Sequence, residues 1–259
     1  SVEAENGSIR STEVGETDAV SVRAFVRGAR GTVTISGFAA RASSPKDVAR
    51  QAVDIARSAD PDPDFRSLPP AEPVKELEGL HDPRLEHFSP SEAVAIVGRA
   101  IDAAKAVDGE AVVMADVSVS AGAGAVANSL GVAVERKSSS IDHGVFVVIK
   151  RSDDVGAFYD FDAGRMLSDV DLAPVGKSAA EAALRFLGAR KIETKSMPVV
   201  LGPLSAHQFI KSVADAANAE SIQRKRSYLV DKAGQKIGSD AVTISDNGPG
   251  IPEEYIHKD

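Results

Sequence analysis

Two stretches of alternating apolar and polar residues near the start of the chain most constrain its fold. Residues 20–27 read VSVRAFVR and residues 32–36 read TVTIS, with glycines between them. Because successive side chains of a strand point to opposite faces, a period of two predicts an antiparallel hairpin with one buried face. Asn6 and Gly7, a strong turn signal, predict a second hairpin within residues 2–14. The chain therefore begins with a half-buried antiparallel sheet.

Helices are predicted where capping residues precede an apolar face. Ser44 and Pro45 mark the start of the first helix, a second spans about residues 89–107, and a third spans residues 178–187 before Gly188. Strands are expected between the last two of these helices, at residues 111–120, 131–140, 145–150 and 157–159. This mixture predicts an α+β fold.

The order of these elements predicts a division into domains. An N-terminal sheet-and-helix domain would be followed by a proline-rich, acidic linker, a central α/β domain and the beginning of a β-rich C-terminal domain. The expected boundaries are 1–65, 66–88, 89–193 and 194–259.

Composition limits the classes of function. The 259 residues have a formal net charge of −8, which argues against a general nucleic-acid surface, and no cysteine, which excludes disulfides and thiolate metal sites within the chain. The sequence shows neither a signal peptide nor an apolar run of membrane-spanning length. We therefore expect a cytoplasmic protein with no direct membrane or nucleic-acid partner.

The stretch from Pro198 to Gly248 has the most distinctive order of features. A short apolar strand at residues 199–201 meets Gly-Pro and is followed by a helix at residues 205–217. A basic cluster and two more short strands follow, at Arg224, Lys225, Arg226, 228–230 and 241–244.

This order resembles the TldD/PmbA family, in which a strand, Gly-Pro, a helix, Arg-Lys-x-Ser and further short strands follow one another. The run VGKSAAEAALRFLGARK at residues 175–191 and the Asn-Ser-x-Gly turn at residues 128–131 also match the family's pattern. Each motif is short, but their order and spacing match from residue 2 to residue 248. Because family members are longer, the resemblance implies that this chain is a fragment.

The resemblance implies a complex of two homologous subunits that processes or degrades peptides, in a family also described as modulators of DNA gyrase. The TldD-like subunit has HExxxH in the helix after Gly-Pro, where two imidazoles hold zinc and the Glu activates water. Here Lys211, Ser212 and Ala216 stand at the His, Glu and His positions. The resemblance thus implies the PmbA (TldE)-like subunit, with no catalytic residue, metal ligand or cofactor of its own.

The implied partner is a TldD-like homologue that bears HExxxH and zinc. This chain would provide heterodimer contacts and part of a substrate chamber, and whether it is an enzyme alone stays open. A non-enzymatic module that binds extended peptides is an alternative, in which strand edges pair with the peptide backbone. Arg224, Lys225 and Arg226 are candidates for peptide or partner contact.

A second alternative comes from residues 243–254, TISDNGPGIPEE, which resemble the Asp-x-Gly-x-Gly box of GHKL ATPases. The resemblance would assign the adenine contact to Asp246 and the close backbone approach to Gly248 and Gly250. Such a site also needs a helical Glu four residues before an Asn. The nearest helical Asn upstream is Asn218, with Ala214 four residues before it, so this requirement is not met.

Other polar residues are interpreted as structural. His143 is expected in a turn and His207 near a helix start, and Asp60, Asp62 and Asp64 form a solvated charge run rather than a cation site. The Gly-x-Gly-x-x-Ala run at residues 122–127 is followed by a turn and not by a helix, so a small-residue turn is favoured over dinucleotide binding.

Overall fold

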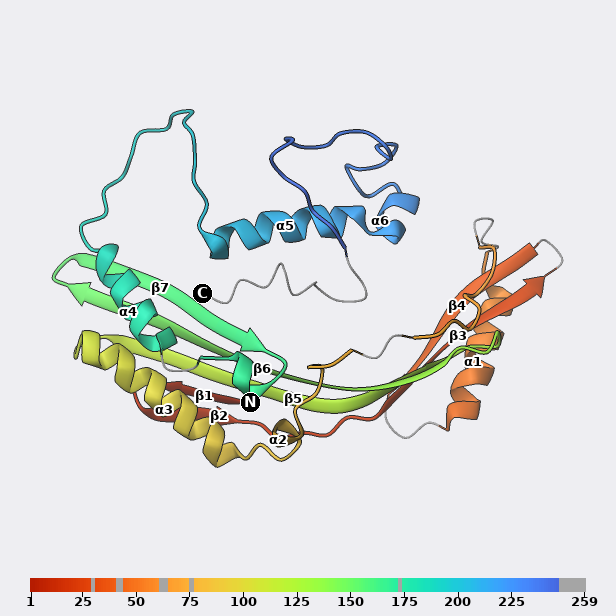
Figure 1. Cartoon of the computed structure of the whole chain (residues 1–259), viewed down its shortest axis with the longest axis horizontal. Coiled ribbons are helices and arrows are strands. Elements are labelled where there is room, and N and C mark those ends of the chain that lie inside the picture. The colour runs from red at the N-terminus through yellow and green to blue at the C-terminus, as the bar shows by residue number, and fades with distance from the viewer. Residues whose placement is uncertain (29–30, 41–43, 61–64, 75–76, 172–173, 247–259) are drawn as a thin grey trace. The chain divides into compact units, whose positions relative to one another are not determined.

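The computed structural model describes residues 1–28, 31–40, 44–60, 65–74, 77–171 and 174–246, and for residues 28 and 31–40 it describes the backbone alone. By its internal contacts the chain divides into two units, Ser1–Ala189 and Arg190–Asp259. Figure 1 shows strands and helices in the first unit and helices in the second. None of the helices in the described ranges is long and apolar enough to cross a membrane.

The first unit is built around a five-stranded antiparallel sheet with the order β2-β1-β5-β6-β7. Asn6 and Gly7 form the turn between the first two strands with positive φ angles of 49° and 85°, so the predicted hairpin is confirmed. The strand bounds are β1 Val2–Glu5, β2 Ser8–Thr12, β5 Val112–Ala127, β6 Ala133–Arg151 and β7 Asp154–Gly164.

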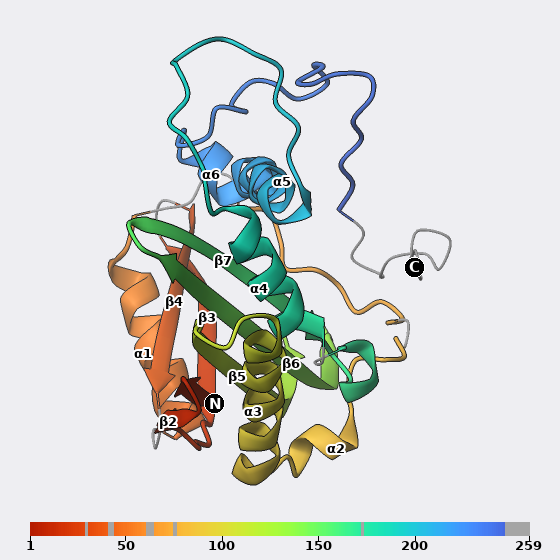
Figure 2. The same cartoon turned by 90° about the vertical axis from the view of Figure 1, so that its left-hand side faces the viewer.

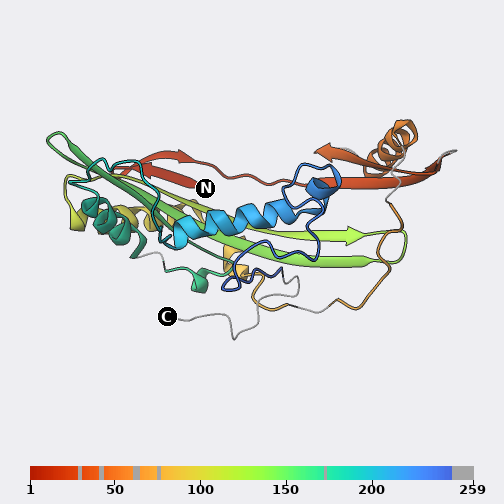
Figure 3. The ribbon, with the colours of Figure 1, turned by 90° about the horizontal axis from the view of Figure 1, so that it is seen from above.

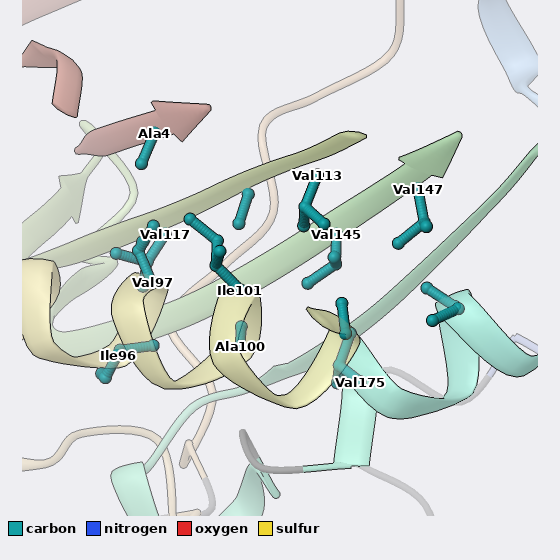
Figure 4. Close-up of a cluster of buried hydrophobic side chains, with 14 of the residues drawn as sticks. Ala4, Ile96, Val97, Ala100, Ile101, Val113, Val117, Val145, Val147 and Val175 are labelled. Carbon is teal, nitrogen blue, oxygen red and sulfur yellow. The ribbon is translucent and has the colours of Figure 1, made fainter. Parts of the chain in front are cut away.

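Helices α3 (Pro90–Val107) and α4 (Pro174–Arg185) pack side by side on one face of this sheet, as Figure 2 shows. Helix α3 begins with a complete capping box, in which Ser89 and Glu92 exchange hydrogen bonds. The sheet and helices bury a core of Val, Ala and Ile, drawn in Figure 4, that includes Ala4, Val97, Ala100, Ile101, Val113, Val117, Val145, Val147 and Val175.

The other two strands of the first unit form a separate hairpin, β3 (Ala19–Gly28) with β4 (Gly31–Ala40). Helix α1 (Pro45–Ser58) packs on it, with Ser44 as its N-cap as predicted. The sequence led us to place the opening hairpin in the same sheet. Instead, β1 pairs with β5, and Val2 and Ala4 join the core of the five-stranded sheet. Alternation of apolar and polar residues predicts a strand with one buried face but not its partner, because strands pair through backbone groups that every residue carries.

Strands β5 and β6 are longer than predicted and continue as a two-stranded ribbon beyond the other strands, as Figure 3 shows. The small residues at 122–127, expected in a turn, pair with residues 133–138. The predicted Asn-Ser-x-Gly turn is confirmed, since the Asn128 side chain accepts from the N–H groups of Leu130 and Val132, and Gly131 has a φ of 92°.

The second unit contains helices α5 (Pro203–Ala217) and α6 (Ala219–Gln223). Helix α5 begins two residues before the predicted start at residue 205, with Gly202 as its N-cap. The strands expected at residues 199–201, 228–230 and 241–244 are not formed within the described range up to residue 246. Because Val200 is 96% exposed and a strand needs a neighbour for its backbone groups, apolar sequence alone does not produce one here.

Candidate functional site

The three residues at the HExxxH positions lie on α5 in an environment that does not suit a metal. Lys211 Nζ lies 2.6 Å from Asp215 Oδ2 one turn along the helix, and both side chains are more than half exposed. Ser212 is exposed, and Ala216 offers no ligand atom. A zinc site needs neutral imidazoles or anionic ligands, and a lysine ammonium is neither. These residues therefore do not fit zinc.

The basic cluster follows α6. Arg224 Nη2 lies 3.0 Å from Glu220 Oε1, and Lys225 adopts a φ of 55°. Neither Lys225 nor Arg226 forms a side-chain ion pair within the ranges the structure describes. The following turn is tied to α5, since Ser227 Oγ donates to the carbonyl oxygen of Ala216 at 2.6 Å. The three basic side chains are therefore exposed beside a turn that is hydrogen-bonded to α5. Their contact with a peptide or a partner stays a prediction.

The described residues do not form a nucleotide site of the kind that the second alternative requires. Asp246 is exposed, and Gly248 and Gly250 lie outside the described residues. Asn218 is the N-cap of α6, where its side chain accepts from the N–H of Glu220 at 2.9 Å. It is therefore occupied as a helix cap.

The remaining polar candidates also stay separate from one another. His207 is exposed near the start of α5, and Asp60 is exposed after α1, whereas Asp62 and Asp64 lie outside the described residues. In the part of the chain that the structure describes, no three His, Asp or Glu side chains are grouped so that they could hold a metal ion.

The placement of His143 contradicts the prediction of a turn. Residues 131–140 and 145–150, expected as two strands, are joined by Ile141–Gly144 into the single strand β6, and His143 is 1% exposed on the face that packs against the helices. Its Nδ1 lies 2.7 Å from the carbonyl oxygen of Asp116, so Nδ1 donates, and its buried Nε2 has no partner among the described atoms. Gly144, the next residue, is a position where side chains approach the strand closely.

The opposite face of the sheet presents a polar group that the sequence did not reveal. A Cβ at Gly144 would lie 2.6 Å from the Tyr159 hydroxyl and 3.0 Å from an Asp116 carboxylate oxygen, so both groups lie over this glycine. Burial raises the pKa of Asp116, and the nearby His143 opposes that rise. Burial, followed by the charge of Asp116, raises the pKa of Tyr159. Register places these residues together, which no local motif could have predicted.

A buried polar cluster fixes the end of the predicted linker. Asp82 is 2% exposed and accepts hydrogen bonds from the Arg84 side chain at 2.7 Å and from the N–H of Leu167 at 2.9 Å. These bonds, Arg84 first, hold the pKa of Asp82 below its usual range. The N–H of Asp82 donates to Ser139 Oγ of β6. Together with helix α2 (Pro83–Glu86), this cluster docks residues 80–88 on the sheet, although we predicted a linker to residue 88.

Family models match most of this architecture. Residues 83–187 match the PmbA/TldA metallopeptidase central domain, which begins at the docked helix α2, and residues 194–257 match the C-terminal domain of the same metallopeptidases.

Individual relatives agree with these matches. The metalloprotease PmbA of Escherichia coli O157:H7 is 26% identical over 258 residues, which cover 95% of this chain and 55% of that protein. The metalloprotease PmbA homolog of Buchnera aphidicola is 26% identical over 121 residues, or 46% of this chain and 27% of that protein. The chain thus spans about half the length of its longer-matching curated relative.

Solved structures show the same fold. A candidate modulator of DNA gyrase from Bacteroides thetaiotaomicron superposes with a TM-score of 0.74 at 20% identity, over 92% of this chain and 55% of that one. TldE from Thermococcus kodakarensis superposes with a TM-score of 0.66 at 20% identity, over 89% and 52%. The two domain models match in chain order, and the Escherichia coli PmbA matches 95% of this chain, so the chain belongs to the TldD/PmbA family of metallopeptidases.

Proposed function

We propose that this chain is the non-metal-binding subunit of a TldD/PmbA-type metalloprotease complex that processes or degrades peptides. The observation that supports it most is the chemistry of α5. Within the segment that matches the family's C-terminal domain, Lys211, Ser212 and Ala216 stand where the resemblance places the zinc ligands and the catalytic Glu. Lys211 is paired with Asp215, which keeps a cation at the first ligand position.

In this proposal the HExxxH-bearing homologue supplies zinc and hydrolysis, and this chain supplies heterodimer contacts and part of the substrate chamber. The fold is shared with the TldE of Thermococcus kodakarensis, which is consistent with the proposal. The exposed basic side chains Arg224, Lys225 and Arg226 are proposed contacts for the partner or for a peptide carboxylate. The cytoplasmic location of the complex stays a prediction of the sequence.

The test is reconstituted peptide hydrolysis. The full-length protein that contains this chain is co-expressed with the HExxxH homologue from the same genome, and cleavage of unfolded, fluorescein-labelled casein is measured. We expect cleavage by the pair, none after Glu→Gln in the partner's motif, and no change with K211A/S212A in this chain. Cleavage by this protein alone, or its loss in K211A/S212A while the pair stays assembled, contradicts the proposal.

A further inference from the structure

Among the residues that the structure describes, one stretch of the outer edge of the β5–β6 ribbon has no neighbouring strand. Strand β7 pairs with β6 only from Ile141 to Arg151, and within the described residues no strand pairs with the same edge from Ala133 to Lys137. Ser139 donates its N–H out of the ribbon, to the carbonyl oxygen of Leu80. The backbone N–H and C=O groups of successive residues in a strand point to opposite edges, so those of every second residue point to the same edge. The backbone groups of Ala133, Glu135 and Lys137 therefore point to the same edge as those of Ser139.

Residues 69–74 and 77–80 line this edge, and they are attached at both of its ends. At the ribbon tip, Asn128 Nδ2 donates to the carbonyl oxygen of Pro69 at 2.8 Å, and at its base Leu80 accepts from Ser139 at 2.9 Å. Between these points lies a cleft of ≈ 860 Å³ lined by residues of both segments, among them Val74, Leu77 and Val134. This volume falls within the range of about 300–1,000 Å³ typical of ligand pockets.

The chemistry of the edge selects the occupant. Ala133, Glu135 and Lys137 each direct one N–H and one C=O to this edge, at the spacing of a strand. An extended peptide backbone carries the complementary groups at the same spacing. The charged side chains there are of mixed sign, with Glu135 beside Arg136 and Lys137, and Lys137 Nζ lies 3.1 Å from Glu86 Oε1. A ligand recognised by one sign of charge, such as a nucleotide or an anionic lipid, therefore has no match there.

We propose that the β6 edge from Ala133 to Lys137 binds a separate, extended peptide as an added strand, in line with β7 and within the cleft that residues 69–74 and 77–80 line. This rests on the proposed function in naming the peptide as substrate, and it assigns backbone recognition to the non-metal-binding subunit. Binding through the backbone is largely independent of peptide sequence, because every non-proline residue offers the same two groups.

The ribbon offers a matched pair of variants. Glu135→Pro removes an N–H that points to the cleft and leaves the bonds to β5 in place, since proline is tolerated at a strand edge. Ala125 lies directly opposite Glu135 in the ladder, so the backbone of Ala125 points to the other edge of the same ribbon. Ala125→Pro is thus an equal perturbation of the ribbon outside the cleft.

The experiment measures fluorescence anisotropy of a fluorescein-labelled heptapeptide, TVTVKVT, with the full-length protein alone and with its partner bearing Glu→Gln. We expect E135P to weaken peptide binding about tenfold, because it removes one hydrogen bond to the peptide and places the proline ring in the cleft. A125P should leave peptide binding unchanged, because its proline lies at the other edge of the ribbon. A heptapeptide N-methylated at alternate positions should bind as weakly to wild type as TVTVKVT binds to E135P. Equal binding by E135P and A125P overturns the proposal.

Amide hydrogen exchange provides a second measurement. We expect the amides of Glu135 and Lys137 to exchange rapidly in the free protein and slowly with peptide. Protection without peptide would mean that another part of the protein already occupies the edge, which overturns the proposal even if the pair of subunits cleaves casein. If this protein and its HExxxH-bearing partner fail to assemble or to cleave casein, the proposed function is contradicted instead. The anisotropy measurement with this protein alone then still decides whether the β6 edge binds peptide.

Discussion

Gly176 of α4 lies directly against the backbone of Ala100 in α3. A Cβ at Gly176 would overlap the carbonyl oxygen of Ala100 and lie 2.9 Å from its carbonyl carbon, and both residues are buried. The absence of a side chain therefore sets how closely the two helices approach on the sheet.

Gly176→Ala is expected to destabilise the full-length protein by about 1–3 kcal/mol, because the helices must move apart. Gly98→Ala on α3 is the control, since a Cβ there meets nothing within 4 Å. It should raise the free energy of unfolding by about 0.5–1 kcal/mol through helix propensity. Urea denaturation measures both, and equal effects of the two substitutions would contradict the close packing of the helices.

His143 provides a test of the corrected strand. His143→Ala should destabilise the protein by about 2–3 kcal/mol, because it removes a buried side chain and its bond to the Asp116 carbonyl. His143→Leu keeps most of the volume and removes the unpartnered Nε2, so its cost should be smaller. Thermal and urea unfolding check the order of the two variants. If both are as stable as wild type, the residue lies in an exposed turn as the sequence had suggested.

Asp82 should make the docked segment sensitive to acid. Its pKa in the folded protein is lowered by Arg84 and by the N–H of Leu167. A carboxyl with a lowered folded pKa stabilises the fold above its unfolded pKa of about 3.9, and this stabilisation is lost as the pH falls below that value. Asp82→Asn should be less stable at pH 7 and lose less stability on acidification. Parallel pH profiles of the free energy of unfolding for wild type and variant would contradict the cluster.

Much of the α+β fold could be predicted because its signals are local. Ser44 and Ser89 mark helix starts, and Asn6 with Gly7 marks a hairpin, through bonds and φ angles that involve neighbouring residues. Strand partners could not be predicted, since β1 meets β5 more than a hundred residues later in the chain. The domain boundaries stay predictions. Residues 80–88 are hydrogen-bonded to strand β6 and to Leu167, a contact that could not be predicted from the sequence.

The candidate site divides in the same way. The helix with Lys211, Ser212 and Ala216 could be located from its Gly-Pro start and its place in a family pattern. His143 was misplaced because residues 131–140 and 145–150 were predicted as separate strands, whereas both belong to the single strand β6. The unpaired stretch of the β6 edge, where no strand pairs among the described residues, could not be predicted because it follows only from the sheet order and register.

The Lys211–Asp215 pair is expected to be dispensable for folding. Both side chains are more than half exposed, so Lys211→Ala should change the free energy of unfolding by less than about 1 kcal/mol. Asp215→Ala, which removes the other member of the pair, should have an equally small effect. A large loss of stability in urea for either variant would show that the pair has a structural role that the exposed geometry does not predict.

Native mass spectrometry with metal analysis tests the central claim most directly. The full-length protein, co-expressed with its HExxxH-bearing homologue, is predicted to form a one-to-one complex with a single zinc. The zinc should remain in K211A/S212A and be lost when the partner's motif is mutated. A zinc-bearing homodimer of this protein alone would contradict the account and return His143 and His207 to consideration as ligands.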